Sequence, residues 1–207
     1  MNALKNFLKV LLFLVGLLLT GWWFMPWRQV GEAVLLTAGG RLPAPASLTY
    51  STVGNARGGF VVNNLEIRNL VGMVDMHFDT VTIVPLTAAS FLSMAPTGQV
   101  AFTGAIIGDI AVTPMRRIPG VAPGNGRVVV SANRQGVFLD NLRTDGELST
   151  RGSLLVAPSG RITWADVVMD IRSEAFEENL SVIGPATGLP LQRDGPGRWS
   201  LRRARGS

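Results

Sequence analysis

The first apolar pattern in the chain is a continuous run near its N-terminus with no polar face. Residues Phe7 to Trp27 read FLKVLLFLVGLLLTGWWFMPW, and from Val10 to Pro26 the one polar side chain other than indole is Thr20. A helix of this length spans about 31 Å, which is the thickness of a bilayer's hydrocarbon core. A helix packed on the surface of a globular domain would carry a polar side. We therefore predict a transmembrane helix over residues 7–27.

The residues that end this run favour an uncleaved anchor over a cleavable signal peptide. A signal peptide has a shorter apolar stretch and small residues at its cleavage site. Tryptophans follow here instead, and their rings suit the membrane interface because the indole N–H reaches water while the ring stays in the apolar boundary. We assign the membrane anchor to Val10, Leu14, Leu18, Trp22, Trp23 and Trp27.

Charge on the two sides of the run predicts its orientation. Lys5 and Lys9 precede or begin the run, whereas Arg28 follows it and is soon balanced by Glu32. By the positive-inside rule, residues 1–6 stay in the cytoplasm and the remainder of the chain is exported. We expect a single-pass protein of a bacterial inner membrane, with a C-terminal domain in the periplasm.

A short helix and a proline-containing linker are predicted over residues 28–47. Val30, Ala33, Val34 and Ala38 recur near helical spacing, and Gly39-Gly40 is suited to end a helix. The sequence RLPAPAS follows, and its prolines favour an extended linker. This segment would separate the membrane from the exported domain, which we place at residues 48–207.

Short apolar stretches with alternating character fill most of the exported domain. Turn signals such as Gly54-Asn55, Asp145-Gly146 and PGNG at 123–126 separate many of them. The pattern predicts a mainly β fold, in which the transmembrane helix is followed by a twisted or curved antiparallel sheet with one or two short helices. The predicted strands are residues 48–53, 59–68, 73–84, 99–106, 109–113, 127–132, 136–142, 146–156, 162–171 and 198–202.

Two local patterns add detail to this sheet. Apolar residues occupy even positions from Val74 to Phe78 and odd positions from Val81 to Ile83, so we expect a bulge near Asp79. The segments Leu86 to Met94 and Ser173 to Ile183 are predicted as short helices.

Composition limits the chemistry that the domain can perform. The chain has no cysteine, which excludes disulfides, thiolate nucleophiles and cysteine-bound metals. Its formal charge of +5 comes from scattered basic residues without a basic stripe, so we do not expect nucleic acid as a partner. Glycines such as Gly124 and Gly126 match no phosphate-binding motif. We expect no cofactor and no metal.

Candidate site residues are few. The one histidine, His77, shares a predicted strand face with Asp75 and Asp79, but metal sites usually gather ligands from several elements, and no nucleophile motif accompanies it. Glu174, Glu177 and Glu178 are interpreted as a solvated acidic face. The pair Arg116-Arg117 lies in a predicted loop and is the better candidate for contact with a partner or a lipid headgroup.

A resemblance to a known family emerges from these features. The order of one uncleaved helix, a short helix and twisted strands interrupted by a short helix in VTIVPLTAASFLSMAPTGQVAFTGAIIGD resembles the type II secretion system protein N (GspN) family. More distantly it is similar to AsmA-like and TamB-like periplasmic β proteins. The C-terminal LPLQRDGPGRWSLRR is similar to a GspN-type ending, in which a glycine turn leads into a last strand.

The resemblance implies a non-enzymatic accessory or assembly component of a type II protein secretion system. Its periplasmic β domain would contact other envelope secretion proteins, and open sheet edges would recruit partner strands. The alternative is a lipid-handling module that holds an acyl chain in a curved sheet. An envelope hydrolase using His77, Asp75 and Asp79 is a third hypothesis, weakened by the missing nucleophile.

Overall fold

The computed structural model of the chain describes residues 21, 24–42, 44–70, 74–86, 89–90, 94–113, 116–158, 161–187 and 190–204. The cytoplasmic segment 1–6, most of the predicted transmembrane helix 7–27 and the anchor residues Val10, Leu14, Leu18, Trp22 and Trp23 lie outside these residues. Among the described residues, no helix is both long enough and apolar enough to cross a membrane.

Antiparallel strands form almost the whole described fold, together with two helices, α2 (Trp27–Arg41) and α4 (Glu174–Thr187). The strands are β1 (Ser47–Thr49), β2 (Thr52–Ala56), β3 (Gly59–Leu70), β4 (Val74–Pro85), β5 (Thr97–Ile107), β6 (Ile110–Thr113), β7 (Arg116–Ile118), β8 (Val121–Asn133), β9 (Gly136–Thr144), β10 (Leu148–Val156), β11 (Ile162–Ile171), β12 (Leu191–Gly195) and β13 (Arg198–Arg203). The prediction of a mainly β protein with a curved antiparallel sheet is confirmed.

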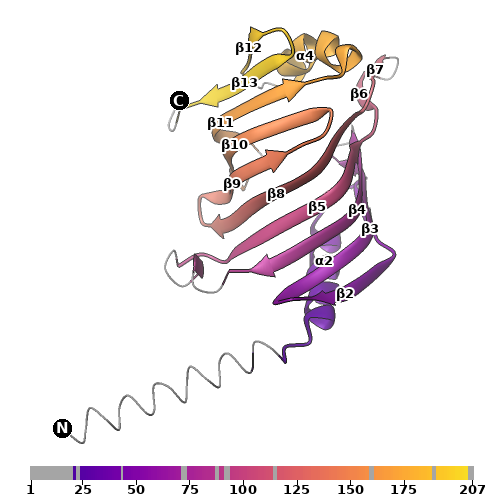
Figure 1. The fold of residues 1–207 in the computed structure, drawn as a ribbon, viewed down its shortest axis with the longest axis vertical. Helices are drawn as coiled ribbons and strands as arrows, with labels where there is room; N and C mark the ends of the chain where they lie inside the picture. The colour runs from indigo at the N-terminus through magenta and orange to yellow at the C-terminus, as the bar shows by residue number, and fades with distance from the viewer. Residues whose placement is uncertain are drawn as a thin grey trace, which may run out of the picture.

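One continuous sheet contains eleven of the described strands. Its order is β1-β3-β4-β5-β8-β9-β10-β11-β13-β12, and β2 also pairs with β3. Most neighbours in the sheet are also neighbours in the chain, as expected for a meander of hairpins. Figure 1 shows the strands curving in sequence from β2 at one end to β12 at the other, with α2 behind the first strands and α4 at the opposite end. The hairpin β6–β7 forms a small separate sheet.

The cross-strand register assigns every side chain to one of two faces. Phe102 packs in the same cluster as α2, and Ile171 packs in the same cluster as α4. Because side chains alternate along a strand and directly paired residues share a face, these two positions can be connected across the sheet. The connecting pairs are Phe102 with Gly126, Val130 with Leu139, Leu139 with Leu154, and Leu154 with Ala165. Gly126 and Val130 share a face of β8, and Ala165 and Ile171 share a face of β11, because each pair is an even number of residues apart. Both helices therefore pack on one face, which we call the inner face; the opposite face is the outer face.

Helix α2 covers the inner face at the N-terminal end of the sheet. Trp27 and Leu35, which are 4% and 6% exposed, pack in one cluster with Val53 and Phe60. Trp27 was expected at the membrane interface, and the structure instead buries its side chain in the core of the β domain. Trp27, Gly31 and Leu35 recur every four residues, so they form one face of the helix.

The structure contains the predicted short helix and corrects two details of it. The helix, which begins at Trp27, passes through Gly39-Gly40 and ends at Arg41. Of the expected apolar side, Val30 is half-buried and packs on the core cluster, whereas Val34 is 46% exposed and Ala33 and Ala38 are also exposed. The helix thus belongs to the β domain rather than to a spacer before it, because burial against Phe60 selects the Trp27–Gly31–Leu35 face.

Helix α4 and the β6–β7 hairpin cover the inner face at the other end. Phe176 and Leu180, which are one helical turn apart, are 6% and 3% exposed and pack with Ile118 of β7 and Trp199 of β13. This confirms the second predicted helix and its apolar pair. Of the first predicted helix, 86–94, Ala89 and Ser90 are helical, and residues 87–88 and 91–93 lie outside the described residues.

The change of apolar phase in β4 lies where it was predicted but is not an inserted residue. The register of β4 with both β3 and β5 is the same before and after Asp79. The two neighbouring strands have irregular backbone at the positions that face Asp79. Asn64 of β3 and Gly104 of β5 adopt positive φ values of 49° and 60° there. A side chain on Gly104 would collide with the carboxylate of Asp79. In all three strands, therefore, the positions that point to the inner face switch at the same level, and the register between the strands is preserved.

Glu177 connects α4 to the final hairpin. Its Oε1 accepts hydrogen bonds from the Gly197 N–H (2.9 Å), Arg193 Nη2 (2.9 Å) and Trp199 Nε1 (3.4 Å). The backbone hydrogen bond from Gly197 is the main cause that lowers the pKa of this carboxyl below its ordinary value; Trp199 and Arg193 act in the same direction, and desolvation opposes them. Glu177 is thus a structural residue rather than part of a merely solvated acidic face.

Two glycines of α2 provide a matched test of helix packing. A methyl group on Gly31 would lie 2.6 Å from Phe60 Cδ2 and 2.9 Å from Val53 Cγ1, whereas nothing lies within 4 Å of such a group on Gly39. We expect Gly31→Ala to lower the free energy of unfolding by about 1–3 kcal/mol through overpacking. Gly39→Ala should raise it by up to about 1 kcal/mol through helix propensity. Urea denaturation measures both, and equal effects would contradict the packing described for α2.

Glu177→Gln tests the link between α4 and the last hairpin. A lowered pKa in the folded state means that the ionised carboxylate stabilises the fold above the ordinary glutamate pKa, and that this stabilisation is lost as the pH falls through the lowered value. The variant should be less stable than the native chain at pH 7, and the difference should shrink as the pH falls. Glu174→Gln, in the same first helical turn, is the control and should change stability less; urea denaturation across pH measures all three chains.

Candidate interaction site

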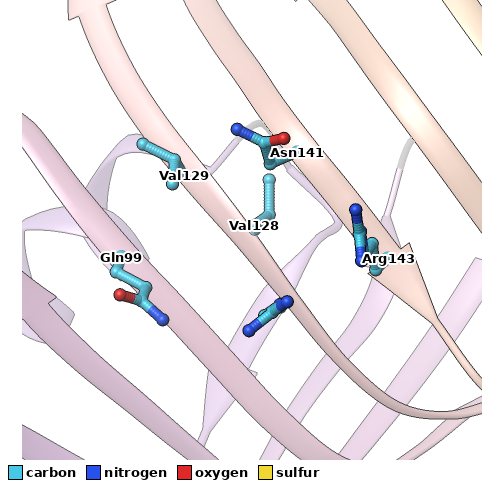
Figure 2. A pocket seen from close by; sticks show the side chains of 6 residues that line it. Gln99, Val128, Val129, Asn141 and Arg143 are labelled. Carbon is cyan, nitrogen blue, oxygen red and sulfur yellow. The ribbon is translucent and has the colours of Figure 1, made fainter.

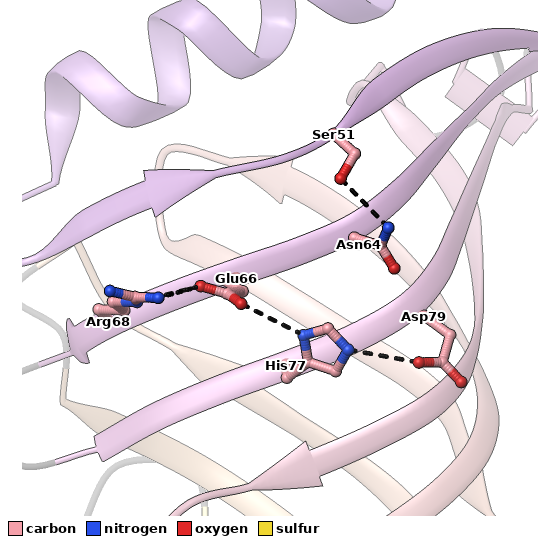
Figure 3. A network of polar contacts seen from close by, with 6 residues as sticks. All are labelled: Ser51, Asn64, Glu66, Arg68, His77 and Asp79. Carbon is pink, nitrogen blue, oxygen red and sulfur yellow. Dashed lines mark hydrogen bonds and ion pairs between the residues drawn. The ribbon is translucent and has the colours of Figure 1, made fainter.

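The environment of His77 differs from the predicted Asp75–His77–Asp79 trio. His77 Nε2 lies 3.3 Å from Asp79 Oδ1, and its Nδ1 lies 3.8 Å from Oε1 of Glu66, the residue directly opposite on β3. Asp75 instead accepts a hydrogen bond from the Asn69 N–H (2.7 Å). Figure 3 shows His77 between the two carboxylates, with Arg68 completing the row through its 2.7 Å ion pair with Glu66.

This row has the character of a solvated ion-pair network. The side chains of His77 and Glu66 are 36% and 35% exposed, and that of Asp79 is 64% exposed. The nearby hydroxyl of Ser51 accepts a hydrogen bond from Asn64 Nδ2 (3.1 Å) in Figure 3. Among the described residues, no group of three histidine or acidic side chains is arranged to hold a metal ion.

The pair Arg116-Arg117 lies in a strand rather than in the predicted loop. Both residues belong to β7, which pairs with β6 through Thr113 with Arg116 and Ala111 with Arg117. Ile118, the last residue of β7, is 0% exposed and fixes this hairpin to the cluster that contains α4. Arg117 is exposed. The hairpin therefore presents at least one arginine to solvent from a fixed position.

Among the strands that the structure describes, the sheet ends in two edges. At one end β1 and β2 both pair with β3, whose other side is occupied by β4, so β1 and β2 follow one another along the same edge. At the other end β12 pairs with β13 alone among the described strands, and its residues Gln192, Arg193 and Asp194 are exposed. An edge strand leaves a row of backbone N–H and C=O groups available to another strand.

The sequence did not reveal which strands form these edges. Strand β12 was not predicted at all, because QRDG has little β propensity and its formation depends on pairing with the last strand. The turn signal Gly195-Pro196-Gly197 before a predicted strand was the one feature that could have revealed it.

Comparison with known proteins identifies the family. A family model described as "Type II secretion system protein GspN-like, Synergistales" matches residues 4–203, which is nearly the whole chain. No curated protein and no solved structure matches the chain. The match covers the apolar N-terminal segment, both helices and every strand described above. The chain belongs to the GspN-like family of type II secretion system proteins.

Proposed function

We propose that this chain is a non-enzymatic accessory or assembly subunit of the inner-membrane part of a type II secretion system. Membership of the GspN-like family over residues 4–203 carries the proposal. The apolar segment that precedes Trp27, residues 7–26, serves as a single-pass anchor with a cytoplasmic N-terminus, and the β domain lies in the periplasm. In that position the sheet meets other envelope proteins of the same machine.

The open edges of the sheet are the contact surfaces in this proposal. A partner segment that adds to β2 or β12 gains main-chain hydrogen bonds without any rearrangement of the sheet. Arg117 on the β6–β7 hairpin lies in a separate small sheet and supplies a charged contact next to the α4 end. Such contacts need no catalytic residues, which agrees with the solvated character of the His77 row.

A photoreactive amino acid placed along the sheet tests this proposal. We expect Thr52 in β2, Gln192 in β12 or Arg117 in β7 to give covalent adducts with other type II secretion proteins in intact cells. Thr103, which is exposed in the interior strand β5, is the matched control and should give far fewer. Mass spectrometry identifies the adducts. Recovery of lipid alone, or equal recovery from Thr103, would contradict contacts through the edges.

Lipid handling remains a second candidate because of one feature of the inner face. Helix α2 packs mainly over β2 and β3, whereas α4 packs with Ile118 of β7, Ile171 of β11 and Trp199 of β13. Between them, Val130, Leu139 and Leu154 form an apolar row across β8, β9 and β10, and all three side chains are half-buried. An acyl chain lying along this row would bury its remaining apolar surface.

Phospholipid retention separates the two candidates. If the row binds lipid, the purified chain should carry phospholipid that Leu139→Gln loses, because a buried carboxamide without a partner opposes an apolar ligand. Ile106→Gln, at a 50% exposed position, is the control and should retain it. Lipid extraction and mass spectrometry measure the content, and circular dichroism checks the fold. Equal lipid content in all three chains would eliminate this candidate.

A further inference from the structure

Three arginines lie side by side on the outer face at the centre of the sheet. Arg127 of β8 is directly opposite Arg143 of β9, and Arg143 is directly opposite Arg151 of β10. Arg127 follows Gly126, which faces Phe102 on the inner face, so the alternation directs the arginines to the outer face. All three are exposed. Directly paired residues on neighbouring strands have Cβ atoms about 5 Å apart, so the three side chains form one continuous basic row.

This basic row lacks the acidic partners that accompany other arginines of the outer face. On the neighbouring strands, Arg198 and Arg202 lie 3.9 Å and 4.0 Å from Asp170 and Asp166. In the described part of the chain, no carboxylate lies within ion-pair distance of Arg127, Arg143 or Arg151. Like charges placed directly opposite one another destabilise a sheet, so an anion bound here would stabilise the fold by reducing the repulsion between the arginines.

The nearest acidic residue along β9 is engaged elsewhere. Asp140 Oδ1 accepts hydrogen bonds from Ser153 Oγ (2.6 Å) and from the Asn141 N–H (2.9 Å). Its Oδ2 accepts a longer hydrogen bond from Asn141 Nδ2 (3.3 Å). These bonds hold the carboxylate in place beside Ser153. Among the described residues, Asp140 thus pairs with neutral donors rather than with the arginines of the row.

A cavity of about 240 Å³ opens at two of these arginines. Its lining consists of Gln99, Arg127, Val128, Val129, Asn141 and Arg143, which come from β5, β8 and β9. Figure 2 shows Gln99 on one side of this space and Asn141 and Arg143 on the other, with Val128 and Val129 between them. By the alternation along β8, Val129 shares the outer face with Arg127, whereas the side chain of Val128 points to the inner face. The N–H donors of the four polar side chains thus lie around Val129.

An irregularity in the backbone creates this arrangement. Asn141 has a positive φ of 51°, and the register of β9 shifts against both β8 and β10 around it. A bulge of this kind bends the strand and redirects a side chain, and bulges occur often beside functional sites. Here it places a carboxamide at the rim of the cavity, next to the basic row.

We propose that Arg127 and Arg143, with Gln99 and Asn141, form a binding site for a phosphate group, and that Arg151 extends its positive field. Guanidinium groups bind phosphate oxygens through paired N–H donors, and a phosphate presents oxygens in several directions. A planar carboxylate presents two oxygens and satisfies one guanidinium fork, whereas donors here come from three strands. The group is either free phosphate or the headgroup of a phospholipid.

Titration of the full chain with inorganic phosphate tests the site. With the chain purified in a phosphate-free, uncharged detergent, calorimetry should show saturable binding. The double variant Arg127→Gln/Arg143→Gln should weaken it at least about tenfold, since charge-assisted hydrogen bonds are lost. Arg143→Lys keeps the charge but loses the planar fork, so an intermediate loss is expected. Arg134→Gln, at an exposed arginine in the β8–β9 turn, is the matched control and should bind as the native chain does.

Vesicles of phosphatidylcholine with and without phosphatidic acid distinguish the two sources of phosphate. Binding that requires phosphatidic acid and is lost in the double variant assigns the site to a headgroup; saturable binding of inorganic phosphate alone assigns it to the free ion. The proposal is overturned if neither binds, if the double variant binds as the native chain does, or if acetate or a glutamate-rich peptide binds more tightly than phosphate. Crosslinking through the sheet edges does not depend on any of these outcomes.

Discussion

The packing of Trp27, Gly31 and Leu35 against Val53 and Phe60 closes the inner face of the sheet where the chain first enters it. An antiparallel sheet with one apolar face is stable only when that face is kept from water. The described chain offers two helices for this purpose, and the sheet is long enough that each covers a different end. The absence of a Cβ at position 31 allows α2 to approach Phe60 closely, and the remainder of the sheet extends from this first contact.

The curvature of the sheet follows from irregularities at matching levels in neighbouring strands. Asn64 and Gly104 adopt left-handed backbone conformations, and both lie beside Asp79 of β4. Asparagine and glycine are the residues that tolerate this conformation at least cost. Because three strands change phase together, the apolar residues stay on the inner face on both sides of the change. In β9 the irregularity at Asn141 is accompanied by shifts of register against both β8 and β10, and a cavity opens beside it.

Local sequence was sufficient for most of the strands and for α4. Alternation between turn signals located strands such as β4 and β11 to within about two residues, because each strand's own residues carry that pattern. The same reasoning placed Trp27 at the membrane interface, whereas the structure buries it in the β domain. The sequence next to an apolar run looks the same whether lipid or protein buries the residue. The same reasoning also missed β7 and β12 because these strands are short and polar, and their pairing partners stabilise them more than their own propensity does.

The candidate sites were less predictable than the fold because they depend on register. Arg127, Arg143 and Arg151 lie on three different strands, and only the pairing of those strands brings them into one row. His77 and Asp79 were recognised because they lie two residues apart on one strand, but Glu66 joins them from β3. Sequence spacing shows which residues are neighbours within one strand or helix. Which residues are neighbours across a sheet depends on the pairing and register of its strands.

The arrangement of the sheet also determines which of its surfaces can bind a ligand or a partner. The inner face is committed to packing at both ends, so binding that leaves the fold intact has to use the outer face, the edges or the apolar row between the helices. The near end of the basic row, Arg151 on β10, lies three strands from the β12 edge along the order β10-β11-β13-β12. Addition of a strand at that edge extends the ladder without touching the guanidinium groups, since the new strand lies beyond β12. A ligand with a phosphate group and a partner strand can therefore occupy one molecule together, and the rigid sheet between them keeps their separation constant.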